Sequence, residues 1–169
     1  EIFLRSSCRD FDSSKKVSIE ELELIMRAGQ MAPSAKNRQP YYFVAIINKD
    51  CRKEIYLAAE GGRRKQFAHL SSEELNKKSE GKTGSNDKSI YDASAAILIF
   101  RASDESYGEA KDQTENLNIK EEQGVATAAY SMMLQAQHMG LSTGWICSPL
   151  YIEKELKEIV IERDEIIED

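Results

Sequence analysis

The sequence predicts a mixed fold, α/β or α+β, in which helices cover a β-sheet. Two apolar runs, "YYFVAII" at 41–47 and "ASAAILIF" at 93–100, predict buried strands. Apolar residues at helical spacing predict helices at 19–30, 49–59 and 120–140. Because strands and helices are interspersed along the chain, we expect the helices to pack on the faces of one sheet.

The length, charge and cysteine usage limit the classes of protein to consider. The chain has 169 residues without internal repeats or a linker, so we expect one domain, 1–169. A net charge of −6 argues against nucleic acid as a partner, because phosphate binding depends on a basic surface. No apolar run approaches the roughly 18 residues of a membrane span, so no membrane partner is expected. Three scattered cysteines, without CxxC or metal-ligand spacing, predict a reducing, cytoplasmic location.

The predicted helices have identifiable ends. Ser18 and Glu21 form the capping-box pattern at the start of 19–30. The stretch 120–140 has the broadest apolar face, and Gly140 is placed to end it. We expect the helix at 49–59 to stop before Gly61.

The remaining segments are predicted from composition. Residues 62–89 are polar and indicate a lid or insertion with a short helix around 71–78. Residues 142–148 indicate a short strand leading into Pro149, and 152–161 a last helix.

The first candidate site is "RSSCRDF", 5–11. On one helical turn Arg5 and Arg9 would share a face with Ser7 between them, and guanidiniums bind phosphate oxygens in pairs. Two interpretations stay open: a phosphate site, or a solvated turn with ordinary surface arginines.

The second candidate is the loop "APSAKNRQP", 32–40. Ser34, Asn37 and Gln39 supply donors and acceptors, and Pro33 and Pro40 stiffen the backbone. Such a loop suits the polar edge of a planar heterocycle. It is equally compatible with a helix-ending turn whose side chains satisfy their own backbone.

The third candidate is "GLSTGWICSP", 140–149. Gly144 would let backbone N–H groups approach a ligand, although a core strand with Trp145 as a packing residue explains the same letters. Cys147 fits an inert thiol better than a redox centre. Neither His69 nor His138 belongs to a nucleophile motif, so we assign no catalytic side chain and no metal site.

Together these clusters resemble the nitroreductase family, the FMN-dependent NAD(P)H oxidoreductases. "RSSCRDF" is similar to the family's R-x-S-x-[RK]-x-F, and "APSAKNRQPYYFVAI" to its P-S-x-x-N-x-Q-P-[WYF]-x-F-x-x. "NDKSIYDASAAILIF" resembles its Asn-led approach to a central strand, and "GVATAAYSMMLQAQHMGLSTGWI" its core helix followed by G-L-x-x-x-W-I. The resemblance covers about 2–161.

The resemblance implies an α+β fold with a mostly antiparallel central sheet flanked by helices. It also implies an intertwined homodimer with two FMN sites at the subunit interface. The family's last strand and basic C-terminal contacts would lie beyond Asp169, so we expect that tail to be missing from this sequence.

The resemblance also assigns cofactor-binding residues. Arg5, Ser7 and Arg9 would hold the phosphate, ribityl chain and pyrimidine edge of FMN, and Asn86 would hydrogen-bond the pyrimidine ring. Pro33, Ser34 and Asn37 would come from the partner subunit, with Gln39 supporting their loop. The backbone of Ile146, Cys147 and Ser148 would lie near flavin N5.

The implied activity is ping-pong transfer of reducing equivalents from NAD(P)H to a nitroaromatic, quinone or similar acceptor. Two alternatives stay open. One is another flavin reaction on the same scaffold, such as dehalogenation, flavin fragmentation or heterocycle dehydrogenation. The other is a non-enzymatic flavin-binding redox module that uses Cys147.

Overall fold

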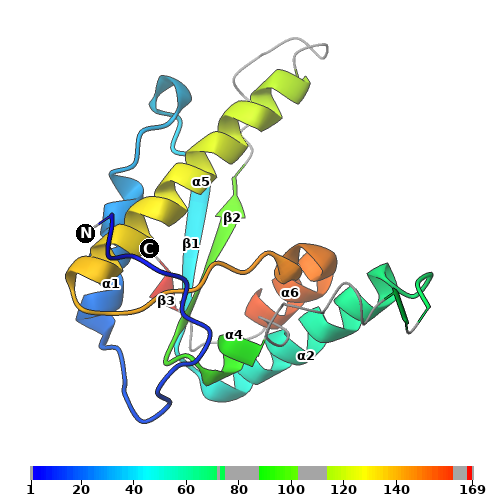
Figure 1. Cartoon of the computed structure of the whole chain (residues 1–169). Helices are drawn as coiled ribbons and strands as arrows, with labels where there is room; N and C mark the ends of the chain where they lie inside the picture. The colour runs from blue at the N-terminus through cyan, green and yellow to red at the C-terminus, as the bar shows by residue number, and fades with distance from the viewer. Residues whose placement is uncertain (1, 72, 75–87, 103–113, 162–166, 169) are drawn as a thin grey trace.

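The computed structural model describes residues 2–71, 73–74, 88–102, 114–161 and 167–168. At its centre is an antiparallel sheet of order β2-β1-β3, made of β1 (Tyr41–Ile46), β2 (Ala96–Arg101) and β3 (Ile167–Glu168) (Figure 1). The predicted α+β fold with an antiparallel sheet is confirmed. A strand at the position of β3 was not expected from the sequence.

Both faces of β1 are buried, because successive side chains of a strand point to opposite faces. Phe43 and Ala45 face α1 (Ile19–Gln30) and α5 (Thr114–His138). Val44 and Ile46 face the opposite layer. All four are at most 2% exposed, which explains why the strand reads as a continuous apolar run.

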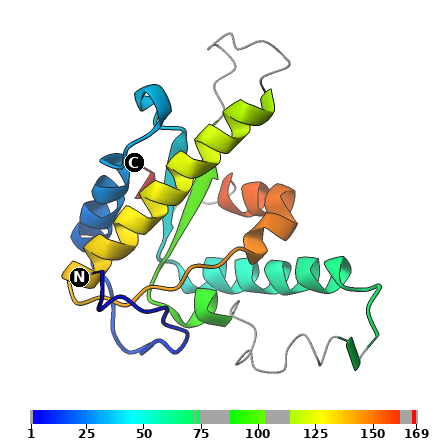
Figure 2. The same cartoon turned by 45° about the horizontal axis from the view of Figure 1, so that its top comes forward.

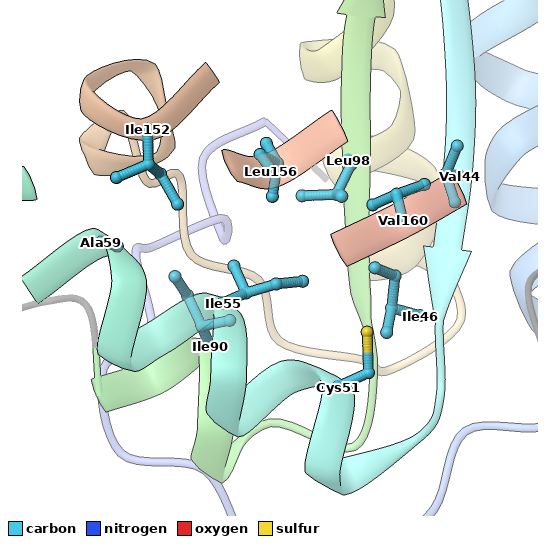
Figure 3. Packing of buried hydrophobic residues seen from close by; sticks show 10 residues of the cluster. All are labelled: Val44, Ile46, Cys51, Ile55, Ala59, Ile90, Leu98, Ile152, Leu156 and Val160. Carbon is cyan, nitrogen blue, oxygen red and sulfur yellow. The ribbon is translucent and has the colours of Figure 1, made fainter. Parts of the chain in front are cut away.

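Within the described residues, four helices form the opposite layer. These are α2 (Lys49–Gln66), α4 (Lys88–Asp92), the 3₁₀ helix η4 (Ser148–Ile152) and α6 (Glu153–Ile161). Figure 3 shows their side chains converging on β1 and β2, with Ile55, Ile90 and Leu156 among them. The sheet is therefore the middle of three layers.

The ends of α1 and α5 follow from their sequences. The Ser18 N–H donates to the Glu21 carboxylate at 2.7 Å and the Glu21 N–H donates to Ser18 Oγ at 3.2 Å, which confirms the predicted capping box. At the end of α5, Gly140 adopts φ +78°, and the Leu141 N–H donates to the Ala136 carbonyl at 2.9 Å. This is the glycine-terminated motif that reverses the chain after a helix.

Three predictions for individual segments were wrong or lie partly outside the described residues. The helix predicted at 49–59 continues through Gly61 to Gln66, so the polar insertion cannot begin at 62. Residues 142–148 form no named strand; Thr143 makes only an isolated bridge. Most of the helix predicted around 71–78 falls outside the described residues.

Gly62 explains why the glycine pair does not end α2. A Cβ at Gly62 would lie 2.6 Å from Ile152 Cγ2 and 3.1 Å from the Tyr151 carbonyl oxygen. The absence of a side chain therefore lets α2 lie directly against η4. Gly62 therefore allows close packing of two helices, whereas the sequence had suggested that the helix ends there.

We predict that Gly29→Ala destabilises the layer formed by α1 and α5. The added methyl group would lie 2.4 Å from Met132 Cε, 3.0 Å from Met132 Cγ and 3.1 Å from Phe43 Cζ. The end of the Met132 side chain can move, but both side chains are buried, so the packing around them must shift. Overpacking of this kind costs about 1–3 kcal/mol, measurable by urea unfolding. The matched control is Gly61→Ala, where nothing lies within 4 Å and a gain of about 0.5–1 kcal/mol is expected. Equal effects of the two changes would contradict the packing argument.

Candidate functional site

The first and third candidate clusters meet in the structure. Ser7 forms a parallel bridge with Thr143, and the Cys8 N–H donates to the Thr143 carbonyl at 2.8 Å. In Figures 1 and 2 the amino-terminal segment runs beside the chain that leaves α5. Gly144 permits this approach, since a Cβ there would lie 2.7 Å from the Cys8 carbonyl oxygen.

Residues 5–9 are not a helical turn, so the geometry expected for Arg5, Ser7 and Arg9 was wrong. The bridge at Ser7 indicates a locally extended chain, in which residues two apart face the same side. Arg5 is half-buried, while Ser7 and Arg9 are exposed. The segment thus carries two guanidiniums and a hydroxyl within five residues, which is the donor set that a phosphate requires.

After Gly144 the side chain of Ile146 is packed against the core, whereas that of the next residue, Cys147, is exposed to solvent. Ile146 packs against the core between the sheet and α2. Cys147 is exposed, and the Trp145 indole N–H donates to its Sγ at 3.2 Å. Ser148 then begins η4, and the Leu150 N–H closes the turn on the Cys147 carbonyl at 3.1 Å. The backbone of 146–148 is therefore held from both ends.

The second cluster, the loop 33–39, has an unusual backbone. Lys36, Asn37 and Gln39 have φ values of 55°, 52° and 49°, in the left-handed region that side chains normally avoid. Such conformations cost about 1–2 kcal/mol per residue. They persist only where surrounding contacts fix them, and they concentrate at functional sites.

Side chains of the loop and its neighbours supply those fixing contacts. Ser34 Oγ accepts from the Gln39 N–H at 2.8 Å, and Gln39 Nε2 donates to the Gln30 carbonyl at 3.1 Å. The Tyr41 hydroxyl donates to the same carbonyl at 3.1 Å and lies 3.3 Å from the carbonyl of Ala32. Burial raises the pKa of Tyr41 above its ordinary value, so the phenol keeps the proton that it donates.

The loop 33–39 does not join the other two clusters within one chain. A Cβ on Gly124 of α5 would lie 3.4 Å from Pro40 Cγ and 3.5 Å from Ser34 Cβ, so the loop sits against Gly124. The chain reaches Thr143 only after α5 ends at His138. Gly124 and His138 are separated by about 21 Å along the helix axis. Figure 2 shows the loop and the amino-terminal segment near different parts of α5.

The family of the chain is decided by its sequence. The profile of the Nitroreductase family matches residues 2–162. The chain belongs to the nitroreductase family.

Individual relatives agree with this assignment. The chain is 45% identical over 51 residues to an oxygen-insensitive NADPH nitroreductase of Helicobacter pylori strain J99. That match covers 30% of this chain and 24% of the relative, about a quarter of its length.

Solved structures share the fold. A BluB-like flavoprotein of Clostridium difficile 630 superposes with a TM-score of 0.79 at 22% identity, over 99% of this chain and 84% of the other. An iodotyrosine deiodinase bound to FMN and 3-iodo-L-tyrosine superposes with a TM-score of 0.70 at 18% identity, over 99% and 83%. At these identities the likeness establishes the nitroreductase fold alone.

All of the predicted cofactor-binding residues except Asn86 lie within the described ranges. Half of the polar insertion at 62–89 also lies outside those ranges. The sequence analysis did not predict that Tyr41 stabilises the loop 33–39 through its hydroxyl. Its position directly after Pro40, at the start of a buried strand, could have indicated this role.

Within the described residues, no three His, Cys, Asp or Glu side chains gather as metal ligands. None of the helices that the structure describes is long and apolar enough to cross a bilayer.

We predict that Gly144→Ala detaches the amino-terminal segment. The new methyl group would meet the Cys8 carbonyl at 2.7 Å, which forces the two backbones apart. The Cys8 amide should then lose its protection in hydrogen exchange, because its bond to Thr143 breaks. Gly61→Ala, which adds a methyl group in open space, is the control. Unchanged exchange at Cys8 in the Gly144 variant would refute the close-approach argument.

Proposed function

We propose that the chain is an FMN-dependent oxidoreductase that passes reducing equivalents from NAD(P)H to a nitroaromatic, quinone or similar acceptor. The observation that carries the proposal is the pairing of segment 5–9 with segment 143–148 through Ser7 and Thr143. This pairing joins a phosphate-type donor set to a backbone segment that is fixed at both ends. Family membership over 2–162 supports the same activity.

Arg5, Ser7 and Arg9 would hold the phosphate and ribityl side of FMN. A guanidinium presents two parallel N–H donors that match phosphate oxygens. Each hydrogen bond to a charged group contributes about 1.5–3 kcal/mol, so two arginines on one phosphate would help to retain a cofactor without a covalent link. The net charge of −6 does not oppose this, because the binding is local.

Ile146, Cys147 and Ser148 would lie beside the reactive edge of the flavin. The packed Ile146 side chain fixes the position of its own backbone, and the turn that opens η4 fixes that of Cys147. A preorganised N–H donor stabilises negative charge as it develops. When bound, FMN supplies the two-electron redox chemistry, so no acidic or basic side chain of the chain is required.

We further propose that the active form is a homodimer packed through α5. From Gln123 to Gln137 this helix carries no charged residue, although Ala126, Thr127 and Tyr130 are exposed. The Thr127 hydroxyl donates to the Gln123 carbonyl at 2.7 Å, so it needs no water. An uncharged helix face with exposed apolar side chains is suited to contact with another element.

A second copy would also complete the flavin site. Because loop 33–39 lies about 21 Å along α5 from the end that leads to Thr143, a partner is the simplest source of a loop at each site. Pro33, Ser34 and Asn37 of a partner would then line the dimethylbenzene side of FMN, with Gln39 holding the loop in shape. The left-handed residues of the loop fit this role.

A second function on the same scaffold is reductive dehalogenation. The superposition with iodotyrosine deiodinase over 99% of this chain favours it, although only as a likeness of fold. Both reactions would use the same cofactor residues.

We also propose a cytoplasmic location. All three cysteines lie within the described ranges and are free thiols, as expected in a reducing compartment.

The function is tested by loading the purified chain with FMN and following the flavin spectrum anaerobically. NADPH or NADH should bleach the flavin, and a nitroaromatic or quinone should restore the colour. Arg9→Gln should weaken FMN binding by about tenfold or more, since it removes a charge-assisted contact. Fluorescence quenching of FMN on titration measures the affinity.

Arg27→Gln is the matched control, because Arg27 is an exposed arginine in the last turn of α1. It should leave FMN affinity unchanged. A chain that cannot be loaded with FMN would overturn the proposed function. Reoxidation by 3-iodotyrosine alone, and by no nitro or quinone compound, would favour dehalogenation.

We predict that Tyr130→Glu converts the dimer to monomers. Tyr130 is exposed on the uncharged face of α5, so in the proposed dimer a carboxylate there would be buried without a partner, which is costly. Sedimentation velocity should show the monomer, and FMN should be lost with it because the partner's loop is gone. Lys53→Glu, on an exposed position of α2, should keep the dimer. If both variants sediment like the parent chain, α5 is not the interface.

A further inference from the structure

We propose that the carboxyl-terminal end of α2, with η4 beside it, binds the phosphate-bearing half of the reduced nicotinamide dinucleotide. The inference rests on the proposed function, since it names a subsite for the electron donor. The residues are Arg63 and Arg64 of α2, and the ring of Tyr151 in η4.

A largely buried carboxylate holds the two arginines side by side. Glu60, with its side chain 14% exposed, accepts from Arg63 Nη2 at 2.9 Å and from Arg64 Nη2 at 3.5 Å. The Arg64 side chain is 79% exposed. Together with Lys65 the cluster has an excess of positive charge. A cation near the carboxyl end of a helix is stabilising in itself, and each guanidinium also offers parallel N–H donors that match phosphate oxygens.

An aromatic surface adjoins the arginines. Tyr151 is 45% exposed, and its ring meets Phe67 edge to face with centroids 6.4 Å apart. Phe67 caps α2, and its N–H donates to the Arg63 carbonyl at 3.1 Å. An exposed ring held in this way can stack on a purine, a contact that every nucleobase offers.

The proposed subsite adjoins the proposed flavin edge along the chain. Ser148 opens η4, and the 3₁₀ rise places Tyr151 about 6 Å beyond it. Gly62 brings α2 against η4, since a Cβ at this position would lie 2.6 Å from Ile152 Cγ2. A ligand whose reacting ring lies at 146–148 would therefore extend over Tyr151 to Arg63 and Arg64.

A nicotinamide dinucleotide has the required shape and charge. Its reacting ring is neutral when reduced, and its phosphates and adenine lie at a distance from that ring. A small nitroaromatic or quinone needs contact only at the flavin, so it would not use a cationic surface beyond η4. The geometry therefore favours the nicotinamide electron donor over the electron acceptor as the ligand of this surface.

The test compares the parent FMN-loaded protein with Arg64→Gln and with the double variant Arg63→Gln, Arg64→Gln. Calorimetric binding of NADP⁺ should weaken about tenfold for the loss of one charge-assisted contact. The KM for NADPH should rise by a similar factor. Oxidation of 1-benzyl-1,4-dihydronicotinamide, a donor without phosphates, should be unchanged, as should the FMN content. Arg27→Gln, the arginine in the last turn of α1, is the matched control.

Each contrary result has one meaning. Unchanged NADP⁺ binding in the double variant would overturn the subsite, whatever the activity. A raised KM for 4-nitrobenzoate but not for 4-nitrobenzamide, with NADPH unaffected, would also overturn it and assign the arginines to an anionic acceptor. Loss of FMN from the variants would overturn it in favour of a cofactor contact. Failure of both NADPH and the benzyl donor to bleach the parent protein would instead reject the proposed function.

Discussion

The candidate site depends on the close approach of two backbones that are distant in sequence. The Cys8 N–H reaches the Thr143 carbonyl only because residue 144 has no side chain. That pairing, with the bridge between Ser7 and Thr143, joins the arginine-bearing segment to the backbone that leads into η4. The glycine-terminated end of α5 directs the chain toward it, since Gly140 in the left-handed region turns Leu141 back along the helix.

The sequence predicted elements whose signal is local. The capping box of Ser18 and Glu21, the strand at Tyr41–Ile46 and the turn at Gly140 all follow from neighbouring residues, and each is present. Predictions failed where distant contacts decide the structure. Gly62 resembles a helix break because its neighbour Gly61 is also glycine, yet Ile152 packs against it and the helix continues.

The same contrast holds for the candidate site: local sequence indicated which residue types are present, but not how they are arranged. The sequence indicated candidate residue types, because paired arginines and a proline-flanked polar loop have distinctive chemistry. It did not indicate their geometry: an i, i+4 spacing suits a helix, but Ser7 bridges Thr143 and the segment is extended. Parallel pairing with a residue 136 positions away leaves no pattern in the local sequence.

The α5 helix links the two halves of the proposed site. One end of its uncharged stretch supports the loop 33–39 at Gly124, and the chain after its other end forms the bridge with Ser7. A rigid helix keeps these two regions apart within a chain, so a single copy would carry both halves of the proposed site without bringing them together. Antiparallel packing of two such helices through their uncharged faces would place the loop of each copy beside the arginine segment of the other. Cofactor binding and association would then be linked by mass action, because each stabilises the arrangement that the other needs.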